Sequence, residues 1–166
     1  MERTAAFGLY TGRLRALHHA FKFGGWDLLA TPLGARLAAL ARAASLSEGA
    51  DALVAVPSTK KRNRERGYDP AVLLADETGR CLGVPRRSLL TRTRETPPQS
   101  SLSAPARRAN VEGAFSASSR AKGRALVLVD DVVTTGATLF AAARALRDAG
   151  ALSVRALILA RTPEVS

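Results

Sequence analysis

Residues 126–138 read LVLVDDVVTTGAT, and this stretch decides which class of fold the chain can adopt. Four apolar residues come first, followed by two aspartates, two valines and a threonine-rich turn around Gly136. A short continuous apolar run bounded by a turn indicates a strand buried on both faces, which is typical of a parallel sheet. The small residues after it indicate a turn into a helix. We therefore expect an α/β fold whose chemistry lies beyond the carboxyl end of this strand.

Other apolar runs on both sides of this stretch repeat the alternation of strand and helix. The strands are predicted within 50–57 and 124–129 and over 153–161, with a weaker one at 88–90. The helices are predicted over 7–23, 28–44, 70–82 and 136–149. This order predicts a mostly parallel, twisted sheet flanked by helices on both faces.

The length of the chain favours one domain over residues 1–166, divided into a helical amino-terminal segment, 1–48, and a core, 50–166. A single cysteine excludes an intrachain disulfide and a cysteine-based zinc site within this sequence. His18 and His19 are adjacent on a predicted helix, so they face different directions and are not expected to chelate one metal. The longest apolar runs have the length of strands, so we expect a cytoplasmic protein without membrane insertion.

The charge balance favours an anionic partner. There are 25 Lys and Arg residues against 14 Asp and Glu, a formal net charge of +11. Such an excess suits phosphorylated metabolites or nucleic acid. A solvated, arginine-rich surface without a specific ligand is the alternative.

The two halves of the 126–138 stretch suit the two halves of a sugar phosphate. Small residues at the start of a helix let backbone amides approach a phosphate at the positive end of the helix dipole, and threonine hydroxyls add donors. The residues of this phosphate cradle are Thr134, Thr135, Gly136, Ala137 and Thr138. Asp130 and Asp131 would repel a phosphate, so they require hydroxyls, a cation or a developing positive charge. The alternative is that these residues only cap a turn and a helix.

This stretch resembles the motif with which type I phosphoribosyltransferases bind phosphoribosyl pyrophosphate (PRPP). The resemblance implies that Asp130 and Asp131 bind the ribose 2′- and 3′-hydroxyls and are the catalytic acids. It implies that residues 134–138 bind the 5′-phosphate. It also implies Mg²⁺ bound together with PRPP, without metal ligands from the protein.

The chain as a whole resembles the ComF family, phosphoribosyltransferase-like proteins linked to DNA uptake in competent bacteria. The segments that carry this resemblance are 10–25, 54–75, 92–99, 107–115 and 123–139. Full-length members often have a four-cysteine zinc segment before the core, and this sequence lacks one. A carboxyl-terminal hood is also lacking, so we expect the acceptor site to be built from the amino-terminal helices, as a small hood, or from a partner.

The basic segment at 58–69 is predicted to be a loop that binds pyrophosphate. Its residues 58–67 hold five cations, Lys60, Lys61, Arg62, Arg64 and Arg66, against Glu65 alone. The resemblance, including the family's R-x-x-x-R-G pattern, assigns pyrophosphate contacts to Ser58, Thr59, Lys60, Arg62 and Arg66. A solvated basic loop is the alternative.

The polar segment at 92–115 holds three prolines and is predicted to be a mobile excursion. Similar loops in this fold close over PRPP and exclude water. Within this lid, phosphate contacts are expected from Arg92, Arg94, Gln99, Arg107 and Arg108, while Asn110 anchors the return of the loop. An ordinary surface loop is the alternative.

Two functions remain in competition. The first is a phosphoribosyltransferase, a pentosyl-group glycosyltransferase that moves the phosphoribosyl group from PRPP to an unidentified acceptor. The second is a non-catalytic PRPP- or nucleotide-binding accessory protein that contacts DNA during natural transformation. Its expected partners are single-stranded DNA or the competence machinery. The motifs identify neither the general base, nor the acceptor, nor the oligomeric state.

Overall fold

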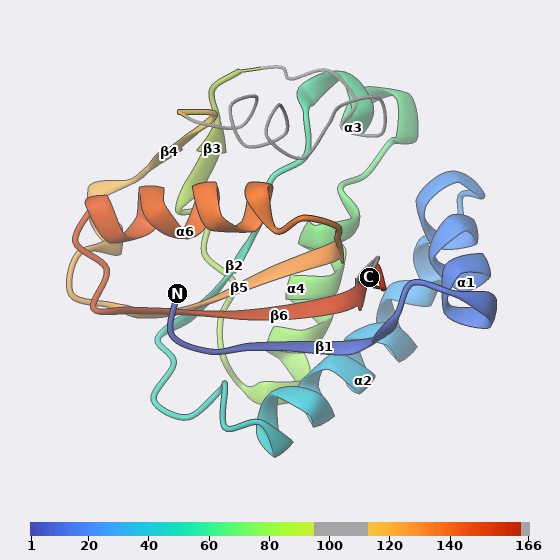
Figure 1. Ribbon diagram of the computed structural model, residues 1–166, viewed down its shortest axis with the longest axis horizontal. Coiled ribbons are helices and arrows are strands. Elements are labelled where there is room, and N and C mark those ends of the chain that lie inside the picture. Colours follow the sequence, from blue (N-terminus) through green and yellow to red (C-terminus); the bar gives the residue numbers. More distant parts are fainter. Residues whose placement is uncertain (95–112, 164–166) are drawn as a thin grey trace.

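A sheet of four parallel strands lies at the centre of the protein (Figure 1). The computed structural model describes residues 1–94 and 113–163, apart from the side chain of Lys60. The strands lie in the order β1 (Thr4–Leu9), β6 (Ser153–Arg161), β5 (Ala125–Val133) and β2 (Ala52–Ala55). All three neighbouring pairs are parallel. The predicted fold class is therefore confirmed.

Helices cover both faces of the sheet because β5 is apolar on both sides. Helix α6 (Ala137–Asp148) lies on one face, and α2 (Ala30–Ala43) and α4 (Pro70–Leu82) lie on the other (Figure 1). Leu126 and Leu128 of β5 pack with Leu139 of α6. Val127 and Val129 alternate with them and pack with residues of α2 and α4. This period of two is that of strand side chains.

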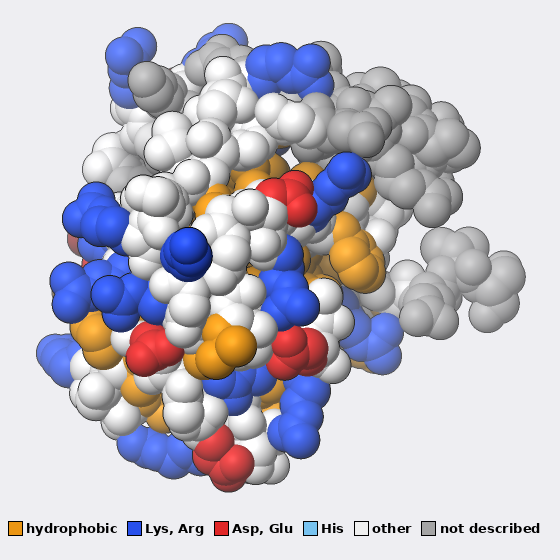
Figure 2. Space-filling model, turned by 90° about the vertical axis from the view of Figure 1, so that its left-hand side faces the viewer, with side chains coloured by type: hydrophobic (Ala, Val, Ile, Leu, Met, Phe, Trp, Pro, Cys, Tyr) orange, Lys and Arg blue, Asp and Glu red, His pale blue; other side chains and the backbone are white. Residues whose placement is uncertain are grey.

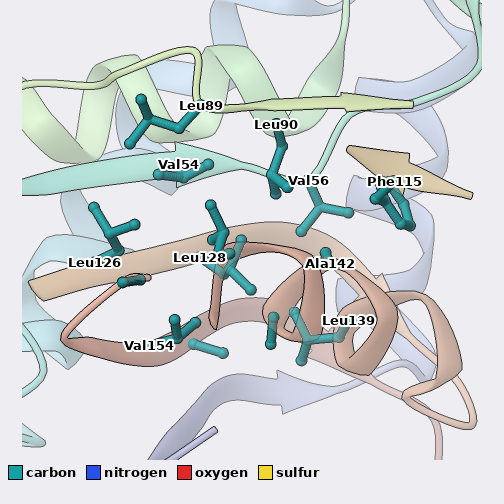
Figure 3. Close-up of a cluster of buried hydrophobic side chains, with 14 of the residues drawn as sticks. Val54, Val56, Leu89, Leu90, Phe115, Leu126, Leu128, Leu139, Ala142 and Val154 are labelled. Atoms are coloured by element: carbon teal, nitrogen blue, oxygen red, sulfur yellow. The ribbon is translucent and has the colours of Figure 1, made fainter. Parts of the chain in front are cut away.

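A second, smaller sheet extends the core on the α6 face. It pairs β3 (Leu90–Arg92) with β4 (Phe115–Ala117) in antiparallel orientation. Figure 3 shows Leu90 and Phe115 in the same cluster of buried apolar side chains as Val56, Leu128 and Leu139. The short helix η3 (Ser119–Ala121) then leads into β5.

Two helices lie near the carboxyl ends of the strands. They are α1 (Gly12–Phe23), followed by the single turn η1 (Asp27–Leu29), and α3 (Lys60–Arg66) (Figure 1). The opposite side of the molecule faces the viewer in Figure 2, where Lys and Arg side chains are scattered among Asp and Glu. Within the described residues, no helix is long and apolar enough to cross a bilayer.

The structure corrects three local predictions. Residues 7–9, predicted as helix, belong to β1, which extends the core sheet; its exposed edge and six-residue length leave a weak apolar pattern. Residues 60–66, predicted as loop, form helix α3, which Thr59 caps and Gly67 ends in the left-handed conformation, φ 85°. The strand predicted at 124–129 continues through both aspartates to Val133.

Replacing Gly34 with alanine should destabilise the fold, although alanine is the better helix former. A Cβ at Gly34 of α2 would lie 2.4 Å from the Cβ of Glu77 in α4, where Thr78 donates a hydrogen bond to the Gly34 carbonyl. The two helices would have to separate, so we expect a loss of about 1–3 kcal/mol in the free energy of unfolding, measured by urea denaturation. An increase of the kind that helix propensity alone predicts would contradict this packing.

Candidate functional site

The two aspartates of β5 lie at its carboxyl-terminal end, and each is only 8% exposed. Successive residues of a strand point to opposite faces of the sheet. Asp130 therefore points to the same face of the sheet as Leu126 and Leu128, the face that α6 covers. Asp131 points to the same face as Val127 and Val129, the face that α2 and α4 cover. The pair has two different environments.

Asp131 is held by side chains of α1. Its Oδ2 accepts hydrogen bonds from His18 Nε2 at 3.0 Å and from Lys22 Nζ at 2.6 Å, and its Oδ1 accepts one from the Val132 amide at 2.8 Å. Burial by itself raises the pKa of this carboxyl, but the charge of Lys22 and the bond from His18 outweigh it, so the pKa lies below its usual value. Asp131 is therefore an ionised, internally paired carboxylate.

Asp130 has fewer partners. Its Oδ1 accepts a hydrogen bond from the Asp131 amide at 2.9 Å. Among residues 1–94 and 113–163, no hydrogen bond to its Oδ2 is found. Burial, and then the adjacent charge of Asp131, raise the pKa of Asp130 well above its usual value. Asp130 is thus the carboxyl of the pair with fewer hydrogen bonds from the described residues.

The threonine turn joins β5 to α6. Thr134 and Thr135 are exposed, Thr138 is half-buried and Ala137 is buried. Gly136 is the N-cap residue of α6, with φ 75°, and it has no side chain with which to cap the helix. A Cβ at Gly136 would touch the ring of Phe140 at 3.4 Å. The first amides of α6 therefore stand at the positive end of a helix dipole, as an anion requires.

The basic segment is organised by one carboxylate, Asp69. It accepts hydrogen bonds from the Ser58 amide at 2.9 Å, from Asn63 Nδ2 at 3.0 Å and from the Ala71 amide at 3.1 Å. Thr59, which is 5% exposed, accepts from the Arg62 amide at 3.4 Å. The Ser58 amide is therefore bonded within the protein.

One arginine, Arg92, brings positive charge near Asp130. The guanidinium of Arg92 lies 5.3 Å from the ring centroid of Phe115. Burial and the charge of Arg62 lower the pKa of Arg92, while Asp130 acts in the opposite direction. Arg62 of α3 and Arg92 of β3 thus lie within electrostatic range of each other, and an anion near both would relieve their repulsion.

Arg66 is directed toward α1. Its guanidinium lies 5.5 Å from the ring centroid of Phe23, and its Nε and Nη1 are buried without a hydrogen-bond partner in the described part of the chain. Next to it, the Tyr68 hydroxyl donates to the carbonyl of Phe21. The end of α1 is therefore attached to the segment that follows α3.

Most of the predicted lid lies outside the described residues, including Gln99, Arg107, Arg108 and Asn110. At its ends, the Thr93 amide donates to the Ala114 carbonyl at 2.9 Å, and the Thr93 hydroxyl donates to the Gly113 carbonyl at 3.1 Å. The excursion therefore leaves and rejoins the fold at one place, beside β3 and β4. Arg94 is exposed there.

Sequence reasoning missed His18 and Lys22. The two residues stand four apart on α1, so they share one helical face. The available signal was a lysine four residues after a histidine beside the apolar positions Leu14 and Phe21. Only the packing of α1 against β5 shows that both reach Asp131.

Three curated relatives were compared with this chain. The DNA utilization protein YhgH of Escherichia coli is 36% identical over 166 residues, which cover 97% of this chain and 73% of the relative. Competence protein F of Haemophilus influenzae is 36% identical over 115 residues, 67% of this chain and 50% of the relative. Competence protein ComFC of Bacillus subtilis is 38% identical over 112 residues, 66% of this chain and 44% of the relative.

A protein family and two solved structures match as well. The family model described as "Phosphoribosyl transferase domain" matches residues 66–165. The allosteric regulatory enzyme of purine biosynthesis superposes on 78% of this chain with a TM-score of 0.54 at 23% identity. Glutamine PRPP amidotransferase of Bacillus subtilis superposes on 76% with a TM-score of 0.51 at 22% identity. This chain spans a quarter of the length of each, 25%, and the likeness concerns the fold alone.

Proposed function

Because the chain belongs to the phosphoribosyltransferase family, within its ComF-like branch, we propose that it binds PRPP with Mg²⁺ and transfers the phosphoribosyl group to an acceptor. One observation carries the proposal: the same strand ends in a carboxyl, Asp130, whose Oδ2 accepts no hydrogen bond from the described residues, and is followed by a helix start with glycine as its N-cap, within residues 134–138. A ribose 5-phosphate uses both features at once.

Three subsites follow from this arrangement. The ribose lies on Asp130, with Asp131 as the second acceptor. The 5′-phosphate lies on the amides and hydroxyls of residues 134–138. The pyrophosphate lies toward α3. The residues predicted to contact it are Ser58, Thr59, Lys60, Arg62 and Arg66. Arg92 adds a cation within electrostatic range of Arg62. Arg94, Gln99, Arg107 and Asn110 of the lid complete the predicted phosphate contacts.

The residues also suit Mg²⁺ bound through the ligand. No group of three or more His, Cys, Asp and Glu side chains able to hold a metal is found in the described parts of the chain. Mg²⁺ retains waters and takes oxygens from phosphates, so this donor set fits an ion that enters with PRPP. When bound, the ion neutralises charge on the pyrophosphate. The protein contributes the carboxylate of Asp130 beside it.

In the transfer, the bond between the ribose anomeric carbon and the pyrophosphate oxygen breaks, and pyrophosphate leaves with the electron pair. The acceptor nucleophile forms the new bond to that carbon and loses its proton to a base. Positive charge develops on the ribose ring in between, and a fixed carboxylate nearby stabilises it. Asp130 supplies that charge, in a site where burial limits screening by water.

A second function is supported by the names of the relatives, a DNA utilization protein and two competence proteins. In this case the chain binds PRPP or a nucleotide without transfer, and contacts DNA through its positive charge of +11. On the side seen in Figure 2, Lys and Arg side chains predominate over Asp and Glu. Release of pyrophosphate from PRPP with a base, amine or nucleic-acid acceptor distinguishes the two functions.

Binding of PRPP and of its parts tests the three subsites. Calorimetric titration of PRPP, ribose 5-phosphate and pyrophosphate, each with Mg²⁺, should show all three bound by the natural protein. Arg62→Ala should weaken pyrophosphate and PRPP by about 10- to 100-fold, because one charge-assisted contact is lost, and should leave ribose 5-phosphate unchanged.

The control for this titration is Arg120→Ala, since Arg120 is an exposed arginine of η3, just before the amino-terminal end of β5. It should change none of the three affinities. The proposed site is wrong if the natural protein binds none of the three ligands.

A further inference from the structure

The acid pair of β5 is asymmetric because α1 contacts only one of its members. A carboxylate has about four acceptor positions. On Asp131, three donors occupy them: His18, Lys22 and the Val132 amide. On Asp130 the only hydrogen bond found within the described residues comes from the Asp131 amide. The protein thus orients one carboxylate completely and leaves the other to a ligand.

In the described parts of the chain, Lys22 is the one lysine or arginine that hydrogen-bonds directly to the acid pair. His18 contacts the same oxygen of Asp131, Oδ2. The side chain of Lys22 is 23% exposed and that of Asp131 is 12% exposed. His18 Nε2 is the donor because a carboxylate only accepts, and its Nδ1 is buried without a partner in the described chain. The ring therefore has one direction in which it can bond, toward Asp131.

The attachment of α1 does not depend on this ion pair alone. Phe21 is fully buried in the core on the α2 and α4 face, and its carbonyl accepts the Tyr68 hydroxyl. Phe23 lies under Arg66. A buried ion pair is in addition a weak source of stability compared with well-packed apolar side chains. The packing of α1 against the core therefore does not by itself account for the Lys22–Asp131 ion pair.

We propose, on the basis of the PRPP site proposed above, that Lys22 is a positioning residue of the ribose subsite. With His18 it holds Asp131 in one orientation and balances its charge beside Asp130. Asp130 then receives the ribose hydroxyls, while Asp131 offers its remaining acceptor position in a fixed direction. The amino-terminal helix α1 is in this way part of the donor site.

The test compares PRPP affinity in Lys22→Met, Lys22→Arg and Asp131→Asn, and in the double variant Lys22→Met/Asp131→Asn. Lys22→Met should weaken PRPP by about 10-fold or more and leave pyrophosphate unchanged, because a charge-assisted contact that orients the ribose site is lost. Lys22→Arg should restore most of the affinity. The double variant should bind PRPP as weakly as Asp131→Asn alone, because Lys22 acts through Asp131. Lys122→Met, a change at an exposed lysine that follows η3, is the matched control.

Each result decides the proposal. If Lys22→Met lowers only the unfolding midpoint and PRPP affinity is unchanged, the lysine is structural and the proposal fails. If Lys22→Met still weakens PRPP in the Asp131→Asn background, Lys22 touches the ligand and a positioning role is wrong. If Lys22→Met fails to fold, the PRPP affinities of Lys22→Met/Asp131→Asn and Asp131→Asn are compared instead, because the double variant leaves neither charge of the pair without its partner. Absence of PRPP binding in the natural protein would instead overturn the proposed function.

Discussion

Replacing Asp130 with asparagine should stabilise the ligand-free protein and remove PRPP binding. Burial and the neighbouring Asp131 raise the pKa of Asp130, so its ionised form is less favourable in the folded than in the unfolded chain. An amide removes this charge, and we expect a gain of about 0.5–2 kcal/mol in the free energy of unfolding at neutral pH. PRPP affinity should fall by about 100-fold or more, because two charge-assisted bonds to the ribose are lost.

The pH dependence of stability provides an independent check on Asp130. Because the folded-state pKa is raised, its contribution is fully present below the unfolded pKa of about 4 and is lost as the pH rises through the folded value. The difference in unfolding midpoint between Asp130→Asn and the natural protein should therefore grow from acid toward neutral pH. A variant that is less stable than the natural protein at neutral pH would contradict this account.

Replacing Asp131 with alanine should have the opposite effect on stability. The change leaves Lys22, 23% exposed, and His18, 3% exposed, without their acceptor. Breaking one side of a buried ion pair costs about 3–5 kcal/mol, and we expect a loss of this size in urea denaturation. The pKa of Asp131 is lowered, so its contribution is present above the unfolded pKa of about 4 and is lost as the pH falls through the folded value.

The matched control for Asp131 is Asp148→Ala. Asp148 pairs with Arg144 at 3.7 Å on the surface of α6, where both side chains are more than 70% exposed, 73% and 71%. Such pairs contribute about 0–1 kcal/mol. Equal losses from the two substitutions would mean that α1 does not bury the Asp131 pair in solution.

If the two substitutions change the free energy of unfolding in opposite directions, the two aspartates have different roles. One carboxylate, Asp131, is stabilised by the hydrogen bonds that it accepts from α1. The other is kept at a cost to stability, as is common for groups that act on a ligand. In the proposed transfer, the ribose hydroxyls donate hydrogen bonds to Asp130 and the positive charge of the reacting ring favours its ionised form.

The local pattern of residues sufficed for the elements with long or continuous apolar runs. The helix predicted at 70–82 and the strand at 153–161 match α4 and β6 in both bounds, because each has a clear period and clear end signals such as Pro70 and Gly83. Strand β1 and helix α3 were missed. An exposed edge strand carries little alternation, and a short helix of charged residues has no apolar face.

The sequence by itself determined the parallel α/β core, the acid pair and the threonine turn of the candidate site, because strand burial and turn chemistry are encoded between near neighbours. Only the tertiary structure decided that the two aspartates differ. Adjacent residues of a strand face opposite sides of the sheet. Asp131 therefore meets His18 and Lys22, which lie 113 and 109 residues earlier, whereas Asp130 lies within electrostatic range of Arg92. No local pattern specifies which distant helix will pack on which face, and that packing sets the charge state of each carboxylate.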